Sequence, residues 1–285
     1  MILRETLQSI RRTLCSGGIC DAAAEAELLV GHLLMMSRTQ LYTQPERDLT
    51  VAERDRLRDL VRRRLGREPA AYIAGRREFY GIEFLVDCRT LIPRPETELL
   101  VERAIEAARC VRGRESPITI ADVGTGCGAI AISLALALPW AEIYATDASA
   151  SALQVAEMNC QRHAVDGRVR LLHGNLLEPL PRPVDMVVAN LPYVRDGELG
   201  YLAPEIRNYE PMLALAGGED GLDKIRKLLE QMPGRISGQA CCLLEVGEGQ
   251  AQMTASLVRG YFPQANIELI TDLAGIERVV IAMQR

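Results

Sequence analysis

The feature that most constrains the fold is an alternation of strand-like and helix-like segments from residue 118 onwards. Ile118–Val123 is mainly apolar, as a parallel strand covered on both faces requires. A glycine loop follows at 124–128, and then a helix over 129–138. Repeated units of this kind predict a doubly wound parallel sheet of the α/β class. Further strands are expected at 143–146, 169–172, 184–189, 240–246, 267–270 and 278–282, with helices at 149–162, 221–231 and 250–261.

The end of the chain departs from this alternation. No helix-length segment separates the last two expected strands, 267–270 and 278–282. Strands joined by a short connection pair antiparallel, because a parallel pair needs a crossover. We therefore expect an antiparallel hairpin at one edge of the sheet.

The first 75 residues are predicted to form helices. Leu3, Leu7, Ile10 and Leu14 recur at the spacing of one helix face. A second helix is expected after Asp21, which could cap it. A third helix, 51–65, has apolar side chains on its inner face (Leu57, Leu60, Val61, Leu65) and arginines on its outer face (Arg54, Arg56, Arg58, Arg62, Arg63, Arg64). The arginine face suits a solvated surface or a docking site for an acidic or RNA-rich partner, and we favour the solvated surface because charge patterning alone is weak evidence.

Short strands replace helices between residues 78 and 92. Aromatic and β-branched residues on either side of 87–90 predict a hairpin with its turn there. Pro93 and Pro95 exclude a helix before Glu96, and a helix over 97–109 follows. These changes predict three parts: a helical domain at 1–76, a hairpin linker at 77–95 and a sheet domain at 96–285.

Composition excludes several classes of protein. The chain is 48% hydrophobic and 25% charged, as ordinary globular proteins are. Its longest nearly apolar stretch, 129–140, is shorter than the ~20 residues of a membrane span, and residues 1–12 lack the apolar core of a signal peptide. The net charge of −5 argues against a protein that mainly grips nucleic acid. We expect a cytoplasmic protein without membrane contact, and no metal site, since the cysteines and the three histidines are scattered.

The glycine loop predicts a nucleotide-like cofactor. Glycines between a strand and a helix let a ligand approach the backbone. Asp147 ends the next strand, where an acid accepts hydrogen bonds from ribose hydroxyls. Gly124, Gly126 and Ala129 satisfy the loose dinucleotide pattern G-x-G-x-x-G/A. The additional Gly128, together with Asp122, favours S-adenosylmethionine instead. A tight turn that binds no cofactor is the alternative interpretation.

A second motif, Asn190-Leu191-Pro192-Tyr193, follows the strand expected at 184–189. Such a strand ends at the same crevice as the glycine loop. The Asn190 amide offers an acceptor, and Pro192 keeps Leu191 extended so that its carbonyl can face the crevice. Tyr193 adds an aromatic face. The set suits a planar NH2 group, held by two acceptors and stacked on a ring.

These motifs resemble those of the release-factor glutamine methyltransferases, whose methylating motif is Asn-Pro-Pro-Tyr. Nearly the whole chain shares the resemblance, in the family's order. The matching segments are 67–75, 77–81, 91–98, 122–129, 209–215 and 217–222, besides 190–193.

The resemblance implies a function and an architecture. The family methylates the side-chain amide nitrogen of the glutamine in the Gly-Gly-Gln motif of class I peptide release factors. It uses S-adenosylmethionine and leaves S-adenosylhomocysteine. Its helical N-terminal domain and hairpin linker help to hold the release factor, and its C-terminal domain is a Rossmann-like class I methyltransferase sheet. The implied catalytic residues are Asn190, Leu191, Pro192 and Tyr193, and the implied cofactor-binding residues are Gly124, Thr125, Gly126, Cys127, Gly128, Asp147, Asn175, Leu176 and Asn190.

This chain departs from the family pattern at two places. Leu191 replaces the first proline of the methylating motif, although a leucine still supplies the main-chain carbonyl. Asn175 stands where the family often has aspartate, and Leu176 stands where it has an aromatic residue. Asn175 can still accept a hydrogen bond from an adenine amino group, whereas Leu176 offers no aromatic stacking.

Three other functions compete with this one. An enzyme that methylates exocyclic amines of nucleic acids, of the N6-adenine type, uses similar motifs, but it needs a basic groove to hold a flipped base. A binding module that has lost catalysis conflicts with the intact Asn190 and Asp147. A dehydrogenase has no use for the 190–193 motif. We therefore expect a monomer whose partners are release factors, without direct binding to nucleic acid.

Overall fold

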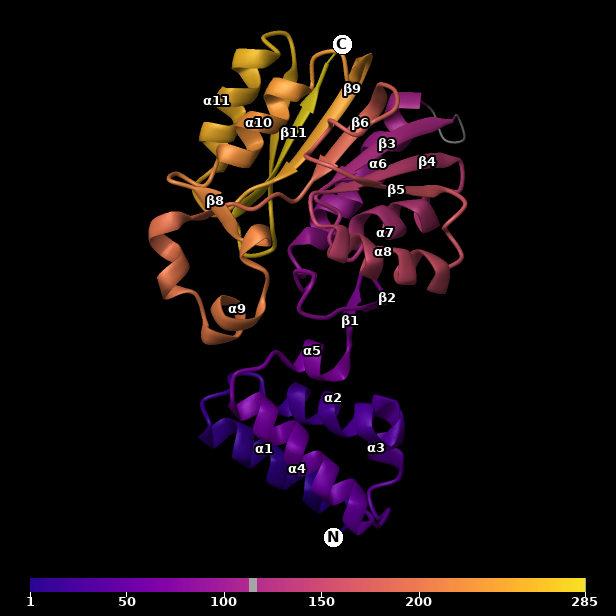
Figure 1. Ribbon diagram of the computed structural model, residues 1–285, viewed down its shortest axis with the longest axis vertical. Coiled ribbons are helices and arrows are strands. Elements are labelled where there is room, and N and C mark those ends of the chain that lie inside the picture. Colours follow the sequence, from indigo (N-terminus) through magenta and orange to yellow (C-terminus); the bar gives the residue numbers. More distant parts are fainter. Residues whose placement is uncertain (113–116, 285) are drawn as a thin grey trace. The chain divides into compact units, whose positions relative to one another are not determined.

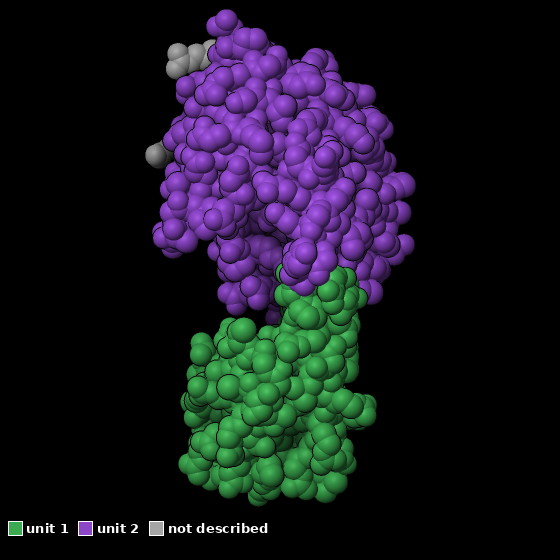
Figure 2. All heavy atoms as spheres, turned by 90° about the vertical axis from the view of Figure 1, so that its left-hand side faces the viewer, with its two compact units in different colours: residues 1–76, 203–209 green, residues 77–202, 210–285 purple. Residues whose placement is uncertain are grey.

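The computed structural model describes residues 1–112 and 117–284. The chain forms two compact units, drawn in different colours in Figure 2. Unit 1 consists of Met1–Arg76 and the distant segment Ala203–Tyr209, and unit 2 consists of Arg77–Leu202 and Glu210–Arg285. Residues 203–209 thus group with the helical part, and nearly the whole hairpin groups with the sheet. Within the described residues, no helix is long and apolar enough to span a membrane.

Unit 1 is helical, as its apolar spacing predicts. Its helices are α1 (Leu3–Ser16), α2 (Ala22–Leu34), α3 (Arg38–Thr43), α4 (Val51–Leu65), α5 (Ala70–Ala74) and α9 (Pro204–Tyr209). Their buried side chains form one core that includes Leu3, Ile10, Leu14, Leu29, Val30, Leu41, Leu57 and Val61. Asp21 stands at the N-cap of α2, but its side chain makes no capping hydrogen bond, contrary to expectation. Side-chain caps are present at two other helices, since the hydroxyls of Ser37 and Thr50 accept backbone hydrogen bonds at the starts of α3 and α4.

Arg64 of α4 is buried rather than on the solvated face where the sequence pattern places it. Only 4% of the residue is exposed. Its guanidinium pairs with Glu25 of α2 and, at 3.1 Å, with Glu205 of α9. Arg67 reaches the same Glu205 carboxylate at 3.2 Å, and the Tyr209 hydroxyl donates to the Gly66 carbonyl at 2.8 Å. These bonds explain why a segment so distant in sequence belongs to unit 1.

Removing the Arg64 guanidinium should therefore destabilise unit 1. We expect Arg64→Leu to lower the free energy of unfolding by about 2–3 kcal/mol, less than the ~3–5 kcal/mol of a fully buried pair, because Glu25 and Glu205 keep some contact with water. Arg62→Leu is the matched control, since Arg62 lies on the same helix with an exposed side chain. Urea unfolding checks the prediction, and equal losses in the two variants would contradict it.

The hairpin forms earlier in the chain than the sequence predicts. It consists of β1 (Arg76–Phe79) and β2 (Ile82–Leu85), with the turn at Tyr80 and Gly81 rather than at 87–90. Both turn residues have positive φ, 52° and 70°, as the favoured two-residue hairpin turn requires. Residues 87–90 form a separate turn, in which the Thr90 amide donates to the Asp87 carbonyl at 3.0 Å.

Unit 2 contains a seven-stranded sheet with the order β10-β11-β9-β6-β3-β4-β5. The strands are β3 (Ile118–Val123), β4 (Ala141–Asp147), β5 (Val169–His173), β6 (Val184–Ala189), β9 (Ile236–Glu245), β10 (Asn266–Thr271) and β11 (Glu277–Met283). Six of them run in the same direction, whereas β11, which lies between β9 and β10, runs antiparallel to both neighbours. The predicted parallel sheet and its antiparallel edge hairpin are confirmed.

Helices cover both faces of this sheet. They are α6 (Thr97–Arg112), α7 (Ala129–Ala137), α8 (Ala150–Arg162), α10 (Asp223–Gln231) and α11 (Ala251–Tyr261). In Figure 1, α10 and α11 lie on one side of the sheet, with α7 and α8 on the other. Sequence patterns missed the short elements between β6 and α10, which are β7 (Val194–Arg195), α9, two 3-10 turns (Asp196–Tyr201 and Met212–Ala214) and β8 (Ala216–Gly218).

The strand register brings four distant residues to one edge. Val123 of β3 pairs with Thr146 of β4 and with Ala189 of β6, and Ala189 pairs with Leu244 of β9. The next residue along each strand therefore falls in one row: Asp147, Gly124, Asn190 and Glu245. The row lies at the carboxyl ends of the parallel strands. At this edge the chain connections leave β3 toward opposite sides, and open α/β sheets bind their ligands at such a point.

Candidate active site

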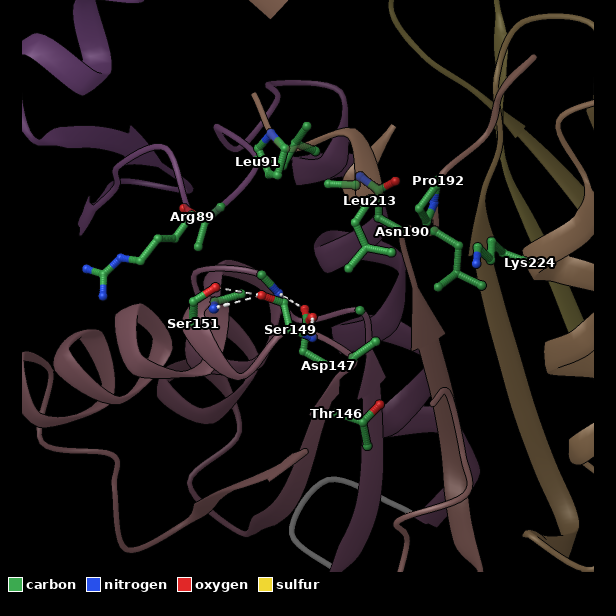
Figure 3. Close-up of a pocket in the computed structure, with 18 of the residues that line it drawn as sticks. Arg89, Leu91, Thr146, Asp147, Ser149, Ser151, Asn190, Pro192, Leu213 and Lys224 are labelled. Carbon is green, nitrogen blue, oxygen red and sulfur yellow. Dashed lines mark hydrogen bonds between the residues drawn. The ribbon is translucent and has the colours of Figure 1, made fainter. Parts of the chain in front are cut away.

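A cavity of about 300 Å³ lies at this edge, entirely within unit 2. Its walls come from the glycine loop, the ends of β4 and β6, and three segments that the sequence did not associate with them, 88–91, 211–214 and the start of α10. In Figure 3, Asp147 and Asn190 border the cavity from different strands, and Leu213 lies above it. Sequence-predicted residues among its walls are Gly124, Gly126, Asp147, Asn175, Leu176, Asn190, Leu191 and Pro192.

The glycine loop presents its backbone to the cavity at two positions whose conformation favours glycine. Gly124 and Gly126 have φ of 78° and 57°, in the left-handed region that favours glycine. A Cβ on Gly124 would also lie 3.3 Å from the Leu191 side chain. At Gly126 no atom lies within 4 Å of such a Cβ among the described residues, so the space there is open.

Three other predicted loop residues support the loop and do not line the cavity. The Thr125 hydroxyl donates to Asp122 at 2.7 Å. Cys127 is buried, and its carbonyl accepts a hydrogen bond from Asn159 at 2.9 Å. Gly128 is the N-cap of α7, and a Cβ there would lie 3.0 Å from Ile132. We infer that these residues hold the conformation of the loop from the side that faces away from the cavity.

Asp122 lies beneath the loop as a fully buried carboxyl. Its Oδ2 accepts hydrogen bonds from Thr125 and from the Ala131 amide, which ties the loop to the first turn of α7. Burial raises the pKa of Asp122 to about 7, although these two hydrogen bonds oppose the shift. Its Oδ1 has no hydrogen-bond partner within the described part of the chain.

Asp147 borders the cavity and is held by the backbone on both sides. One oxygen accepts from the Gly126 amide at 2.9 Å and the other from the Ser149 amide at 2.8 Å. Burial raises the pKa of Asp147, and the two amide hydrogen bonds act in the opposite direction. A carboxylate has about four lone-pair sites, so Asp147 keeps acceptor capacity for a ligand diol.

Asn175 and Leu176 line the cavity beyond the end of β5. The Asn175 amide nitrogen donates to Glu178 at 2.8 Å, which leaves the amide oxygen as an acceptor. Leu176 is nearly buried and has a φ of 52°, an uncommon conformation for a branched residue. The backbone is therefore held in a costly conformation beside the cavity, as is common at functional sites.

The 190–193 motif meets the cavity through its first three residues. The Asn190 amide nitrogen donates to Thr97 Oγ1 at 3.0 Å. Leu191 and Pro192 line the wall, whereas the Tyr193 ring is not part of it. Burial is the main cause that raises the pKa of Tyr193 to about 12, and Glu245 adds to the shift.

Sequence reasoning missed several residues of the site. Thr97 and Glu245 contact Asn190 from α6 and β9. Lys224 and Leu213 border the cavity, and Leu213 is 54% exposed. Glu245 carries the one signal that the sequence offered, because an acid interrupts an apolar strand at the same end as Asn190. Nothing local marks the others, whose roles follow from chain segments that meet only in the fold.

Gln250 is a buried residue that fixes the backbone behind the motif. Its amide nitrogen donates to the Tyr193 carbonyl at 2.9 Å and to the Asp220 carbonyl at 3.3 Å, while its oxygen accepts from the Gly247 amide at 2.8 Å. Only 3% of the residue is exposed. Every polar atom of the side chain is therefore used to join three loops.

We expect Gln250→Glu to lower the free energy of unfolding by about 2 kcal/mol or more, because a carboxylate would face two carbonyl oxygens without a donor. Gln161→Glu is the control, since Gln161 is an exposed glutamine near the end of α8. Urea unfolding of both variants measures the difference. A Gln250 variant as stable as its control would show that these bonds do not hold the loops.

The sheet order and the glycine loop define a Rossmann-like class I methyltransferase. Comparisons with known proteins agree with this class. Residues 97–205 match a family model described as the methyltransferase small domain, and residues 5–75 match the PrmC N-terminal domain. A methyltransferase structure from Pyrococcus furiosus aligns with a TM-score of 0.52 at 15% identity, covering 72% of this chain and 90% of that one, which supports the fold alone.

Sequence relatives define the family more narrowly. The release factor glutamine methyltransferase of Moorella thermoacetica is 39% identical over 289 residues, covering 100% of this chain and 99% of that protein. The one from Chlorobaculum tepidum is 40% identical over 273 residues, covering 93% and 91%. The chain belongs to the release factor glutamine methyltransferase family.

Proposed function

We propose that this protein transfers the methyl group of S-adenosylmethionine to the side-chain amide nitrogen of the glutamine in the Gly-Gly-Gln motif of class I release factors. S-adenosylhomocysteine is the second product. The observation that carries the proposal is the position of Asn190, whose amide lies in the cavity wall next to the glycine loop. The names of the relatives supply the substrate class.

The described residues fit S-adenosylmethionine. Gly124 and Gly126 present backbone where a side chain would intrude or strain the loop, and Asp147 keeps acceptor capacity for ribose hydroxyls. Asn175 offers its oxygen to an adenine amino group, and Leu176 provides an apolar surface. When bound, the cofactor supplies an electrophilic methyl group. In our proposal, Thr125, Cys127 and Gly128 contribute by shaping the loop.

The 190–193 motif would hold the substrate amide. The Asn190 side-chain oxygen and the Leu191 carbonyl would accept its two N–H groups, and this acceptance favours a pyramidal nitrogen with an available lone pair. Pro192 keeps Leu191 extended. Tyr193, whose ring is not part of the cavity wall, would support the motif through its main chain, whose carbonyl Gln250 holds. An amide nitrogen is a weak nucleophile, so alignment in a dry site is the main contribution, worth up to ~7–11 kcal/mol. The surplus proton then leaves to water.

The other parts of the chain would serve recognition of the substrate. We propose that the helical domain, residues 1–76, and the hairpin linker, residues 77–95, help to hold the release factor. The methyltransferase domain, residues 96–285, carries the chemistry. We place the protein in the cytoplasm, as a monomer that does not bind nucleic acid directly. The acidic net charge of −5 supports the last point.

The proposal is tested by incubating the full-length protein with S-adenosylmethionine labelled in its methyl group. The acceptors are a purified class I release factor, the same factor with the Gly-Gly-Gln glutamine changed to alanine, and double-stranded DNA. We expect label only in the unchanged factor. Label in DNA would favour the nucleic-acid alternative, and label in the alanine variant would place the methyl group on another residue.

A further inference from the structure

The buried carboxyl of Glu245 lies next to Asn190. The pairing of Ala189 with Leu244 places Glu245, the last residue of β9, beside Asn190 at the carboxyl edge of the sheet. Only 2% of Glu245 is exposed, and it is not part of the cavity wall. The Thr97 hydroxyl and the Asn190 amide lie close enough to this carboxyl to lower its pKa. Its Oε2 has no hydrogen-bond partner among the residues that the structure describes.

We propose that Thr97 and Glu245 are positioning residues, which fix the Asn190 amide with its nitrogen inward and its oxygen toward the substrate. The inference deepens the proposed function and rests on it. The two ends of an asparagine amide have nearly the same shape but opposite hydrogen-bonding character. A reversed amide would present N–H groups to the N–H groups of the substrate, and transfer would fail.

The contacts on the inner side fix this orientation. Asn190 Nδ2 donates to Thr97 Oγ1 at 3.0 Å, and the Asn190 side chain also lowers the pKa of the neighbouring Glu245. An asparagine nitrogen carries two protons, and in our proposal one goes to Thr97 and the other faces Glu245. The amide oxygen is then the end that remains for the cavity. Thr97 can perform this role because it is the first residue of α6 and is itself buried.

The ionised form of Glu245 sets the direction of these hydrogen bonds. A carboxylate only accepts hydrogen bonds, so the Thr97 hydroxyl donates to Glu245 and keeps its lone pairs for Asn190. A protonated Glu245 can donate to Thr97, and the amide orientation is then no longer enforced. Burial raises the pKa of Glu245 to about 7, and the nearby charge of Glu96 raises it further. Thr97, Arg278 and Asn190 each lower the pKa and so oppose this shift.

This arrangement predicts how transfer depends on pH. Because the ionised carboxyl is the active form, the rate should increase as pH rises through about 7. Among the described residues, Arg278 of β11, Glu96 before α6 and the phenol of Tyr193 also act on or lie near Glu245. Asp122 at the same edge also has its pKa raised to about 7, so the Glu245→Gln variant is needed to separate the two carboxyls. That variant should be slower, and its rate should vary less with pH.

Thr97→Val and Thr97→Ser form the decisive pair of variants. Valine keeps the shape of threonine but removes the hydroxyl, whereas serine keeps the hydroxyl. In single-turnover transfer to a release factor, we expect Thr97→Val to be slower on the order of 10²-fold, as a misplaced reacting group is. Thr97→Ser should recover most of the rate. Affinity for S-adenosylhomocysteine, measured by calorimetry, should be nearly the same in all three proteins.

A second measurement does not depend on catalysis. Hydrogen exchange of the Asn190 side-chain amide, followed by NMR after selective asparagine labelling, should be slow in the parent and in Thr97→Ser and faster in Thr97→Val. Equal exchange in all three proteins would overturn the inference, and so would a serine variant as slow in transfer as the valine variant. If the parent transfers no methyl group to a release factor, the proposed function fails, while the exchange measurement still tests the orientation of the amide.

Discussion

Changing Asn190 to alanine is expected to lower the single-turnover rate of methyl transfer on the order of 10²–10³-fold, as loss of one positioned polar group in a dry site does. The change removes the acceptor for one N–H of the substrate amide. It leaves the Gly124 and Asp147 side of the cavity in place, so affinity for S-adenosylhomocysteine should change little. Rapid-quench measurements with labelled cofactor give the rate, and calorimetry gives the affinity.

Two further variants sharpen this prediction. Asn190→Asp keeps an acceptor of the same size and should retain more activity than Asn190→Ala if acceptance is the role. Asn266→Ala is the control, because Asn266 is an exposed asparagine at the start of β10. Near-parental transfer by Asn190→Ala would contradict the assignment, as would a defect confined to cofactor binding.

Changing Asp147 to alanine is expected to weaken the binding of S-adenosylmethionine on the order of 10²-fold, since hydrogen bonds to a charged group contribute about 1.5–3 kcal/mol each. The change also leaves the Gly126 and Ser149 amides without their acceptor, which loosens the glycine loop. Calorimetric titration measures the affinity. Glu157→Ala, which removes an exposed acid from α8, is the control. An Asp147 variant that binds as tightly as this control would remove Asp147 from the cofactor site.

Sequence patterns predicted the regular elements well, because a helix or strand that packs on a core needs apolar residues at a characteristic spacing. Helix α4 (Val51–Leu65) and the strands β3 (Ile118–Val123) and β6 (Val184–Ala189) have the predicted bounds. The hairpin turn was predicted at 87–90 because those polar residues separate apolar ones. The structure places it at Tyr80 and Gly81, since the tight turn needs two residues with positive φ.

Contacts between distant segments lay beyond these patterns. Arg64 shares its helix with exposed arginines, so the sequence pattern did not distinguish it from them. Its burial follows from its ion pairs with Glu25 and Glu205. Glu205 belongs to a six-residue helix with no long apolar period. The same limitation hid Thr97, whose contact with Asn190 joins the start of one helix to the end of a distant strand.

The candidate site was partly predictable because parallel strands end at one edge. Asp147 and Asn190 follow predicted strands, and the register brings both to the cavity. Thr125 and Cys127 were included with their neighbours, yet their side chains turn into the protein, where they bond to or pack beneath the loop. The direction of each side chain in an irregular loop depends on φ and ψ, which a sequence motif does not specify.

The central claim is that the methyl group reaches the glutamine amide nitrogen of the Gly-Gly-Gln motif. Peptide mass spectrometry tests it most directly, after a class I release factor is incubated with S-adenosylmethionine and either the parent protein or Asn190→Ala. We predict a single added methyl group on the side chain of that glutamine with the parent, and far less with the variant. An unmodified glutamine, or a methyl group on any other residue, would contradict the account.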